Sequence, residues 1–247
     1  MRARLRQELT VRSYETDPVG RLQVPILCKL LQEVAVAHAA ILGVAVETLF
    51  ERGTAWVLSR LHLSMQRWPG ADEEILIETW PEAVNRLFVD RRFSVLAQDG
   101  SPIGSVSTLW FVLELNRRRP VRLPANIGDK IEGYDIDTDP MRPPEIAPPD
   151  SVDRELAFTV RRSDLDMAAH VNNTSYVEWA IEAVPDLVWR DRDLSRLEIQ
   201  FLRECHHGHT VLSRSQTIDG EVRHQLVRHE DGVEVARART VWQERGQ

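Results

Sequence analysis

Apolar and polar positions follow the same succession of periods twice along this chain of 247 residues. In each half, a short alternating segment ends in a polar turn, an apolar helical stretch follows, and further alternating segments complete the half. Alternation with a period of two is typical of half-buried strands, and a long apolar stretch without it is typical of a buried helix. The pattern therefore predicts one helix followed by an antiparallel meander, made twice.

The first half begins with alternation at Leu9, Val11 and Ser13, and a turn follows at residues 14–21. Residues 24–43 are apolar all round, which predicts a buried helix with Pro25 in its first turn and Gly43 as its stop. The next strand-like segments are residues 55–68, 74–84, 87–100 and 104–115, with Asp99-Gly100 as a hairpin turn.

The second half repeats this order. It has a strand and turn at residues 155–166, an amphipathic helix at residues 172–189, and strands at residues 195–205, 209–220, 221–232 and 233–244. Asp219-Gly220 and Asp231-Gly232 mark two hairpin turns. When the halves are aligned at the junction of turn and helix, Asp17 falls opposite Asp166 and Arg21 falls opposite His170. Only the second half has a titratable histidine there.

Proline and acidic residues crowd the segment between the halves, where neither period survives. We therefore expect a first unit at residues 1–119, a linker at residues 120–152 and a second unit at residues 153–247. A helix laid across an antiparallel sheet buries one face of that sheet, and two such units can join their sheets edge to edge.

The composition is that of a soluble globular protein, with 43% hydrophobic and 28% charged residues. A net charge of -7 argues against nonspecific nucleic-acid binding. The basic run at residues 116–122 and the pair Arg161-Arg162 are most simply solvated, although an acidic partner protein would fit them. We expect a cytoplasmic protein without a membrane span, because no apolar run approaches roughly 18 residues and no signal peptide is recognisable. The two cysteines, Cys28 and Cys205, are expected to be free thiols.

The candidate chemistry lies where the strand of the second half gives way to its helix. Asp166 and His170 flank this junction, and a helix start presents backbone N–H groups that can stabilise an oxyanion. Taken alone, Asp166 is as well explained as a turn residue, and Asn172 or Asn173 as the N-cap of the helix. His170 is harder to explain structurally because it stands between a carboxylate and a helix start.

The pattern LDxxxHVNNxxYxxWxxEAVP, followed about twenty residues later by Arg203-Glu204-Cys205, closely resembles the acyl-acyl carrier protein thioesterases of plants and bacteria. The resemblance covers essentially the whole chain. It implies an α+β fold of the tandem (double) hotdog type, in which two long helices are each wrapped by an antiparallel sheet. It also implies hydrolysis of fatty acyl-acyl carrier protein, without a cofactor, in fatty acid biosynthesis.

Carried over by position, the catalytic set that the resemblance implies is Asp166, His170, Glu204 and Cys205. The family has an asparagine where this chain has Ala168, which cannot hydrogen-bond a water or a thioester through its side chain. The resemblance also implies that the first half holds the fatty chain. The expected substrate-binding residues are Asn172, Asn173, Trp56, Leu30 and Val34.

Hydrolysis of a thioester needs a group that takes a proton from the attacking water. We assign Glu204 as the general base, His170 as its partner in positioning the water, and Asp166 as the group that fixes the turn or orients the water. Cys205 is a second candidate, as a nucleophile activated by a histidine. Alternation over Cys205, His207 and His209 would also place three metal ligands on one face, but a polar turn is the better interpretation and we expect no metal.

Three functions fit these residues. The first is a hydrolase that acts on an acidic acyl carrier protein, as a monomer or a homodimer. The second is an acyl-CoA thioesterase with the same catalytic group. The third is an acyl-binding or regulatory protein that has lost turnover, for which Ala168 is the argument. We favour the enzyme because His170 and Glu204 are both retained.

Overall fold

The computed structural model describes residues 4–84, 86–123 and 146–245. The helices and strands of the first half are β1 (Leu5–Thr10), α1 (Val24–Ile41), α2 (Val46–Glu51), β2 (Thr54–Met65), β3 (Glu74–Val84), β4 (Phe88–Ala97), β5 (Pro102–Glu114) and β6 (Arg119–Val121). Those of the second half are β7 (Arg154–Thr159), α4 (Asn173–Glu182), α5 (Asp186–Asp191), β8 (Arg192–Phe201), β9 (Thr210–Ile218), β10 (Glu221–Arg228) and β11 (Val233–Glu244). A short 3-10 turn follows the first strand of each half. It is Ser13–Glu15 in the first half and Arg162–Asp164 in the second.

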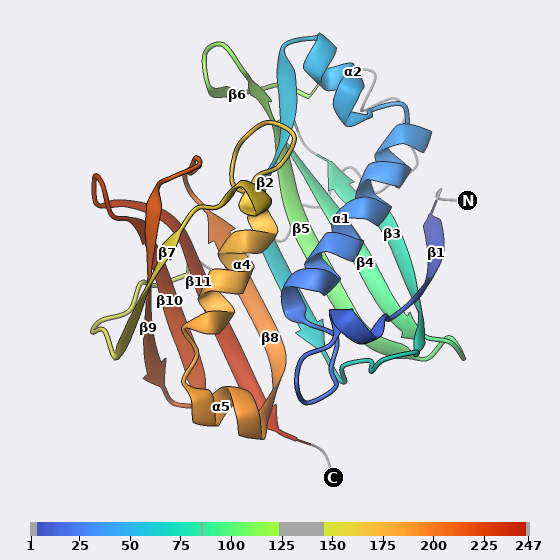
Figure 1. The fold of residues 1–247 in the computed structure, drawn as a ribbon. Helices are drawn as coiled ribbons and strands as arrows, with labels where there is room; N and C mark the ends of the chain where they lie inside the picture. The colour runs from blue at the N-terminus through green and yellow to red at the C-terminus, as the bar shows by residue number, and fades with distance from the viewer. Residues whose placement is uncertain (1–3, 85, 124–145, 246–247) are drawn as a thin grey trace.

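Within the described residues, the strands form one antiparallel sheet of eleven strands in the order β1-β3-β4-β5-β2-β8-β11-β10-β9-β7, with β6 paired to β5. The halves join where β2 pairs with β8, from Arg60 opposite Gln200 to Ser64 opposite Arg196. Both central helices, α1 and α4, lie on the same side of this sheet and pack side by side (Figure 1). This arrangement is the expected double hotdog.

The first central helix has the predicted position, since α1 carries a proline in its first turn and ends before Gly43. By length and composition alone, α1 would qualify as a membrane span, which corrects the expectation that no apolar run reaches that length. Its packing explains its composition, because Leu27, Leu31 and Val34 lie in the core against the sheet. Burying each of these side chains contributes about 1.5–3 kcal/mol.

The second central helix is shorter than predicted. The expected helix at residues 172–189 is divided into α4 and α5, and Pro185 is the N-cap of α5. Proline has no N–H and its ring clashes with the preceding turn, so an α-helix cannot continue through it without a break. The division lets the chain turn back towards β8.

Two boundaries also differ from the sequence prediction. The strand expected to end in Arg203-Glu204-Cys205 ends at Phe201, so these three residues lie in the following loop. The predicted linker begins inside β6, whose Pro120 and Val121 pair with β5. The rest of the linker up to residue 145 lies outside the described residues, apart from residues 122 and 123.

All three predicted hairpin turns are present, and each glycine in them has a positive φ.

Candidate active site

The turn at residues 166–170 is organised by the carboxylate of Asp166. Its Oδ1 accepts the backbone N–H groups of Ala168 at 2.9 Å and of His170 at 3.1 Å. The backbone closes the same turn, since Asp166 N–H donates to the carbonyl of His170 at 2.8 Å. Ala169 takes up a left-handed conformation with φ of 60°. These contacts fix the position from which the His170 ring projects.

The start of α4 follows directly. Asn172 is the N-cap, and its Oδ1 accepts both the backbone N–H of Thr174 at 2.9 Å and the Thr174 hydroxyl at 2.8 Å. The N–H of Ser175 donates to the carbonyl of Asn172. Asn173 is the first residue of the helix and its side chain lines a cavity between α1 and α4. Asn172 therefore caps the helix and Asn173 lines the cavity, and a role of either residue in substrate binding stays a prediction.

Glu204 meets His170 from the loop that follows β8. The Nε2 of His170 lies 3.4 Å from the Oε2 of Glu204, and the Nε2 of His206 lies 3.8 Å from its Oε1. A third group, the guanidinium of Arg118, donates to the same Oε1. The carbonyl of Glu204 accepts from Arg228 at 2.9 Å, which holds the loop in place. The structure thus brings together the predicted pair and adds two residues to it.

The surroundings keep His170 neutral. Partial burial lowers the pKa of its imidazole below the usual 6.5, and the positive charge of Arg118 and the neighbouring His206 act in the same direction. The charge of Asp166 opposes this shift without cancelling it. A neutral imidazole can accept a proton or a hydrogen bond at neutral pH.

Cys205 has the environment of a core residue. Its side chain is fully buried, and burial raises the pKa of its thiol. Its carbonyl accepts the N–H of Val171 at 3.0 Å, which ties the loop to the turn. The thiolate is the nucleophilic form of cysteine, so a raised pKa and full burial both oppose a nucleophilic role.

The metal arrangement considered from the sequence is not the one in the structure. Residues 203–209 form a loop with a tight turn, so the strand alternation needed by Cys205, His207 and His209 is absent there. Among the described residues, one group has metal-ligand spacing, namely His170, Glu204 and His206, whose ligand atoms lie within 4.8 Å of one another. The cation of Arg118 already occupies one oxygen of Glu204 in this group.

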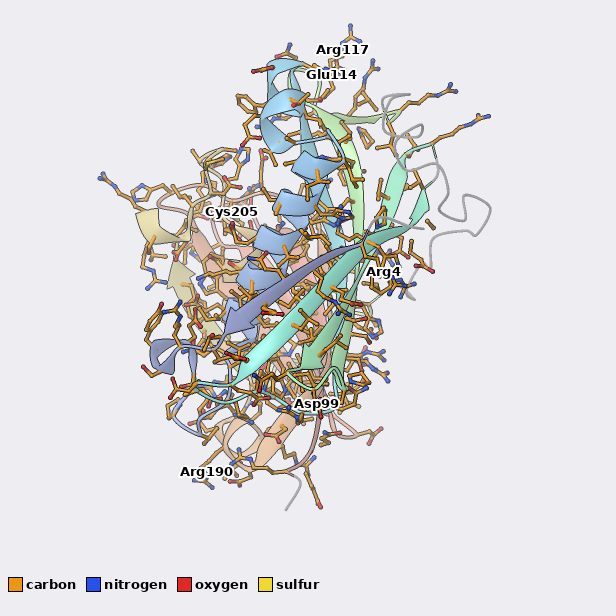
Figure 2. The ribbon with its side chains drawn as sticks, turned by 90° about the vertical axis from the view of Figure 1, so that its right-hand side faces the viewer. Arg4, Asp99, Glu114, Arg117, Arg190 and Cys205 are labelled. Carbon is orange, nitrogen blue, oxygen red and sulfur yellow. The ribbon has the colours of Figure 1, made fainter. Side chains whose placement is uncertain are left out.

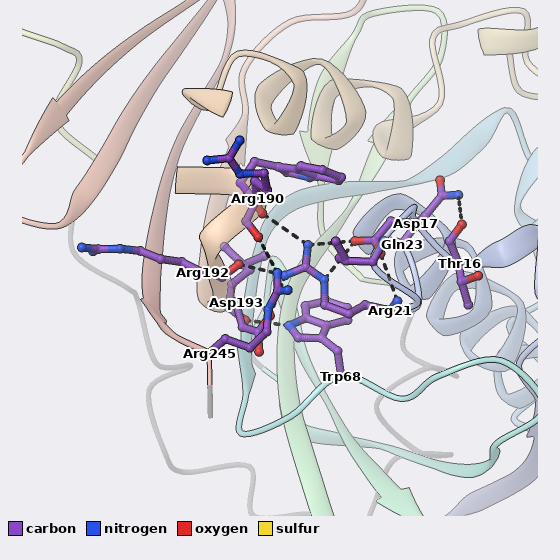
Figure 3. Close-up of polar contacts among 12 residues, drawn as sticks. Thr16, Asp17, Arg21, Gln23, Trp68, Arg190, Arg192, Asp193 and Arg245 are labelled. Atoms are coloured by element: carbon purple, nitrogen blue, oxygen red, sulfur yellow. Dashed lines mark hydrogen bonds and ion pairs between the residues drawn. The ribbon is translucent and has the colours of Figure 1, made fainter. Parts of the chain in front are cut away.

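The first half contains the same turn without the chemistry. Asp17 Oδ1 accepts the N–H groups of Val19 and Arg21, each at 3.0 Å, as Asp166 does for Ala168 and His170. Figure 3 shows how the guanidinium of Arg21 is used: it bonds Asp17 at 2.9 Å, Asp193 at 2.6 Å and the carbonyl of Arg192 at 2.8 Å. Arg21, the residue opposite His170 when the halves are aligned, therefore bonds the first half to the second.

The position of Glu204 also has a counterpart. The N–H of Leu22 donates to the carbonyl of Pro69 at 2.8 Å, as that of Val171 donates to Cys205, so Trp68 is the equivalent of Glu204. The indole N–H of Trp68 donates to the carbonyl of Leu194 at 2.7 Å. A cavity of about 230 Å³ lies beside Arg21 and Trp68, and its lining contains no histidine.

The cavity beside the candidate site is apolar and lies between the two central helices. It measures about 20 Å³. Its lining comes from both halves and consists of Cys28, Leu31, Gln32, Ala35, Leu58, Leu61, Phe93, Thr108, Trp110, Asn173, Thr174, Val177 and Phe201. This volume holds about one water molecule, so the cavity as it stands is too small for an acyl chain.

The other residues expected to bind substrate lie elsewhere. Val34 is fully buried in the main core and Leu30 packs against that core. Trp56 packs in a smaller core cluster beside α2, and its indole N–H donates to the carbonyl of Val44 at 3.1 Å. None of the three is among the residues that line this cavity as described. A role for them in chain binding stays a prediction.

The two residues that sequence reasoning missed are Arg118 and His206. Arg118 belongs to the basic run at residues 116–122, and His206 lies within the segment from Cys205 to His209 that was considered as a metal site. No local spacing relates Arg118 to Glu204, because the two are 86 positions apart.

Comparison with known proteins gives the family of this chain. The chain matches the acyl-ACP thioesterase N-terminal domain over residues 3–131 and the C-terminal domain over residues 148–244. It belongs to the acyl-ACP thioesterase family. The family comprises hydrolases of thioesters, and the division between its two domains falls within the Pro-rich segment.

Individual relatives and solved structures support the assignment. The chain is 30% identical over 257 residues to dodecanoyl-[acyl-carrier-protein] hydrolase of Cinnamomum camphora, covering 96% of this chain and 67% of that protein. Against a palmitoyl-acyl carrier protein thioesterase of Cuphea hookeriana, at 25% identity, it spans 61% of the relative's length. An acyl-ACP thioesterase of Bacteroides thetaiotaomicron superposes with a TM-score of 0.86 at 27% identity, covering 97% of this chain and 98% of that one. The 12:0-ACP thioesterase of Umbellularia californica gives the same TM-score at 25% identity, with 98% of each chain covered.

Proposed function

We propose that this protein hydrolyses fatty acyl-acyl carrier protein to a free fatty acid and the carrier. The observation that carries the proposal is the contact between His170 and Glu204 at the start of α4. The names of the plant and bacterial relatives support acyl carrier protein as the carrier.

In the proposed reaction, a water held between Glu204 and His170 attacks the thioester carbonyl. Its proton passes to the carboxylate of Glu204, and the neutral imidazole of His170 holds the water and relays the proton to the departing thiolate. The carbonyl oxygen becomes an oxyanion, which the N–H of Asn173 at the helix start stabilises. Collapse of the tetrahedral intermediate breaks the carbon–sulfur bond and releases the carrier thiol and the fatty acid.

Asp166 acts on the turn rather than on the water in this mechanism. Its Oδ1 is engaged by two backbone N–H groups, which supports the first of the two roles considered for it. Cys205 remains a candidate only as a packing residue, because a covalent mechanism needs an accessible thiolate.

Steady-state hydrolysis of matched acyl-ACP and acyl-CoA thioesters of several chain lengths tests the proposal. We expect kcat/KM to favour the carrier protein, and Glu204→Ala and His170→Ala each to lower kcat by about 10²–10⁴-fold, the usual contribution of a general base. Cleavage of CoA esters alone would replace the carrier assignment with the acyl-CoA alternative. Binding of acyl groups without release of acid from any of them would favour the acyl-binding protein.

Three further properties follow from the proposal and the sequence. The partner is an acidic acyl carrier protein, which the basic run at residues 116–122 fits by charge. The enzyme acts in the cytoplasm. It acts as a monomer or a homodimer, since the pairing of β2 with β8 already joins two hotdog units in one chain.

A further inference from the structure

Arg118 reaches the candidate active site from the other half of the molecule. It lies in the turn between β5 and β6, at the same hairpin tip as Arg117 and Glu114, which Figure 2 shows far from Asp99 at the opposite end of the sheet. Its guanidinium nevertheless donates to the Oε1 of Glu204 in the second half. Arg118 therefore connects the first half of the chain to Glu204, the proposed general base.

The backbone at Arg118 has a conformation that is uncommon for arginine. Arg118 has a φ of 49°, in the left-handed region that residues other than glycine rarely adopt. Its N–H donates to the carbonyl of Glu114 at 2.8 Å, which closes the hairpin turn. A left-handed arginine at a hairpin tip is disfavoured unless its surroundings hold it, and such residues cluster at functional sites.

Both carboxylate oxygens of Glu204 have a partner in this arrangement. His170 lies at Oε2 and Arg118 at Oε1, so the plane of the carboxylate is set by one residue from each half. A carboxylate on an exposed loop otherwise samples several rotamers, and a base that is displaced by about 1 Å loses much of its rate advantage. A guanidinium suits the task because its N–H groups are fixed in a rigid plane.

Ala168 stands where the family has an asparagine, and this difference bears on the role of Arg118. The Ala168 side chain offers no hydrogen bond, and its backbone N–H is already engaged by Asp166. The site therefore has one side-chain donor fewer than the residue pattern of its family supplies, and Arg118 brings a donor to it from outside the turn.

We propose that Arg118 is a positioning residue for hydrolysis, which holds the carboxylate of Glu204 in the orientation that faces His170 and the attacking water. It does not contact the substrate. This inference rests on the proposed function, because it assumes that Glu204 is the base.

Two simpler roles of Arg118 would have different effects on stability and kinetics. A purely structural ion pair would affect stability, but the Arg118 side chain is 63% exposed, and exposed pairs contribute little. A docking role, in which Arg118 binds the acidic carrier, would affect KM for carrier substrates only. A positioning role affects kcat, whatever carries the acyl group.

The test uses the full chain with Arg118→Ala, Arg118→Lys and, as a charge-matched control outside the basic run, Arg52→Ala at an exposed position. Each variant is assayed on an acyl carrier protein thioester and on the N-acetylcysteamine thioester of the same acid, which has no carrier and no phosphate. We expect Arg118→Ala to lower kcat at least about tenfold on both substrates, with KM nearly unchanged. Arg118→Lys should restore part of the loss, and Arg52→Ala should match the wild type.

A pH profile adds a readout that packing alone would not move. Four groups face His170, namely Asp166, Glu204, His206 and Arg118, and the charge of Arg118 contributes to the low pKa of His170. Removing this charge raises that pKa, so the acid limb of kcat/KM should move to higher pH in Arg118→Ala. The melting temperature should stay within about 2 °C of the wild type, as expected for an exposed pair.

Each of three outcomes would overturn the inference. A raised KM for the carrier substrate with unchanged kcat on the N-acetylcysteamine thioester would make Arg118 a docking residue and overturn the inference. Equal losses from Arg118→Ala in the wild-type and Glu204→Gln backgrounds would also overturn it, because a residue acting through Glu204 loses its effect there. If the wild type hydrolyses no thioester, the proposed function fails and the inference with it.

Discussion

The protonation state of His170 is set by groups from three segments. Burial lowers the pKa of the imidazole, Arg118 and His206 lower it further, and Asp166 raises it. A histidine with these neighbours stays neutral at pH 7, as its proposed role requires, and it becomes protonated only at a pH below the ordinary 6.5.

We expect NMR titration of the His170 ring to give a pKa below 6.5, and kcat/KM to fall as the pH drops through that value, because the protonated ring cannot accept a proton. In Asp166→Asn, the amide oxygen can still accept the two backbone N–H groups while the charge that raises the pKa is lost. The His170 pKa should then fall further, and the acid limb should move to lower pH. An acid limb that does not follow the His170 pKa in either protein would exclude His170 as the titrating group.

A second expectation at this scale concerns Cys205. Because its thiol is buried and its pKa is raised, Cys205→Ala should keep kcat within a few-fold of the wild type and lower stability by about 1–2 kcal/mol through the small cavity left. Iodoacetamide should not inactivate the native enzyme. Rapid inactivation that substrate prevents, together with an inactive Cys205→Ala variant that still folds, would restore the covalent mechanism.

The residues of the site differ in how far the sequence reveals them. Asp166 and His170 are recognisable because they lie in one turn, at a spacing that a helix start follows, and Glu204 because it follows a strand in a distinctive tripeptide. Arg118 is not recognisable as a partner of Glu204, because its contact depends on where the first-half hairpin lies over the second half. Local pattern identifies what a segment presents, whereas contacts across the halves depend on the packing of the whole chain.

At the level of elements, the duplicated turn connects the first strand of each half to its helix. The two copies share the aspartate that accepts two N–H groups, and both pass through the left-handed region one residue before the end, at Gly20 with φ of 85° and at Ala169 with φ of 60°. A left-handed conformation costs roughly 1–2 kcal/mol for a residue with a Cβ atom and little for glycine.

This difference predicts opposite effects of exchanging the two residues. Gly20→Ala should destabilise the protein by about 1 kcal/mol, since a Cβ there meets no atom within 4 Å and the cost is confined to the backbone. Ala169→Gly should stabilise it by about 0.5–1 kcal/mol after the entropy of glycine in the unfolded chain is subtracted. Urea unfolding of both variants measures the two differences. Destabilisation by Ala169→Gly would mean that the two turns are not equivalent.

The elements themselves were largely predictable. The alternating segments correspond to strands within a few residues, because each strand has one face in the core and one in solvent, and β3 and β11 have the predicted bounds. The short elements α2, α5 and β6 were not predicted as separate elements, since three to six residues are too few to show a period. Pro185 was a sufficient signal for the break between α4 and α5, and the apolar positions on either side of it obscured that signal.

At the scale of the whole molecule, the two halves share one sheet and one core. β2 pairs with β8 along five residues, α1 packs against α4, and the main core cluster draws side chains from both halves. The repeat was visible in the sequence and implied two similar units. Their edge-to-edge junction was an expectation from the general behaviour of sheets, and the structure confirms it at β2 and β8.

The shared sheet predicts that the second half cannot function alone. Expressed as residues 146–247, it would leave the N–H and C=O groups of β8 unpaired along one edge and would expose the face of α4 that packs on α1. We expect this fragment to associate or aggregate in sedimentation experiments, and to show kcat/KM at least about 100-fold below the full chain, because it lacks both Arg118 and the α1 wall of the cavity. The full chain, measured in the same way, is the control, and it should sediment as one species with full activity. A monomeric fragment with full activity would show that the first half contributes neither to the site nor to its stability.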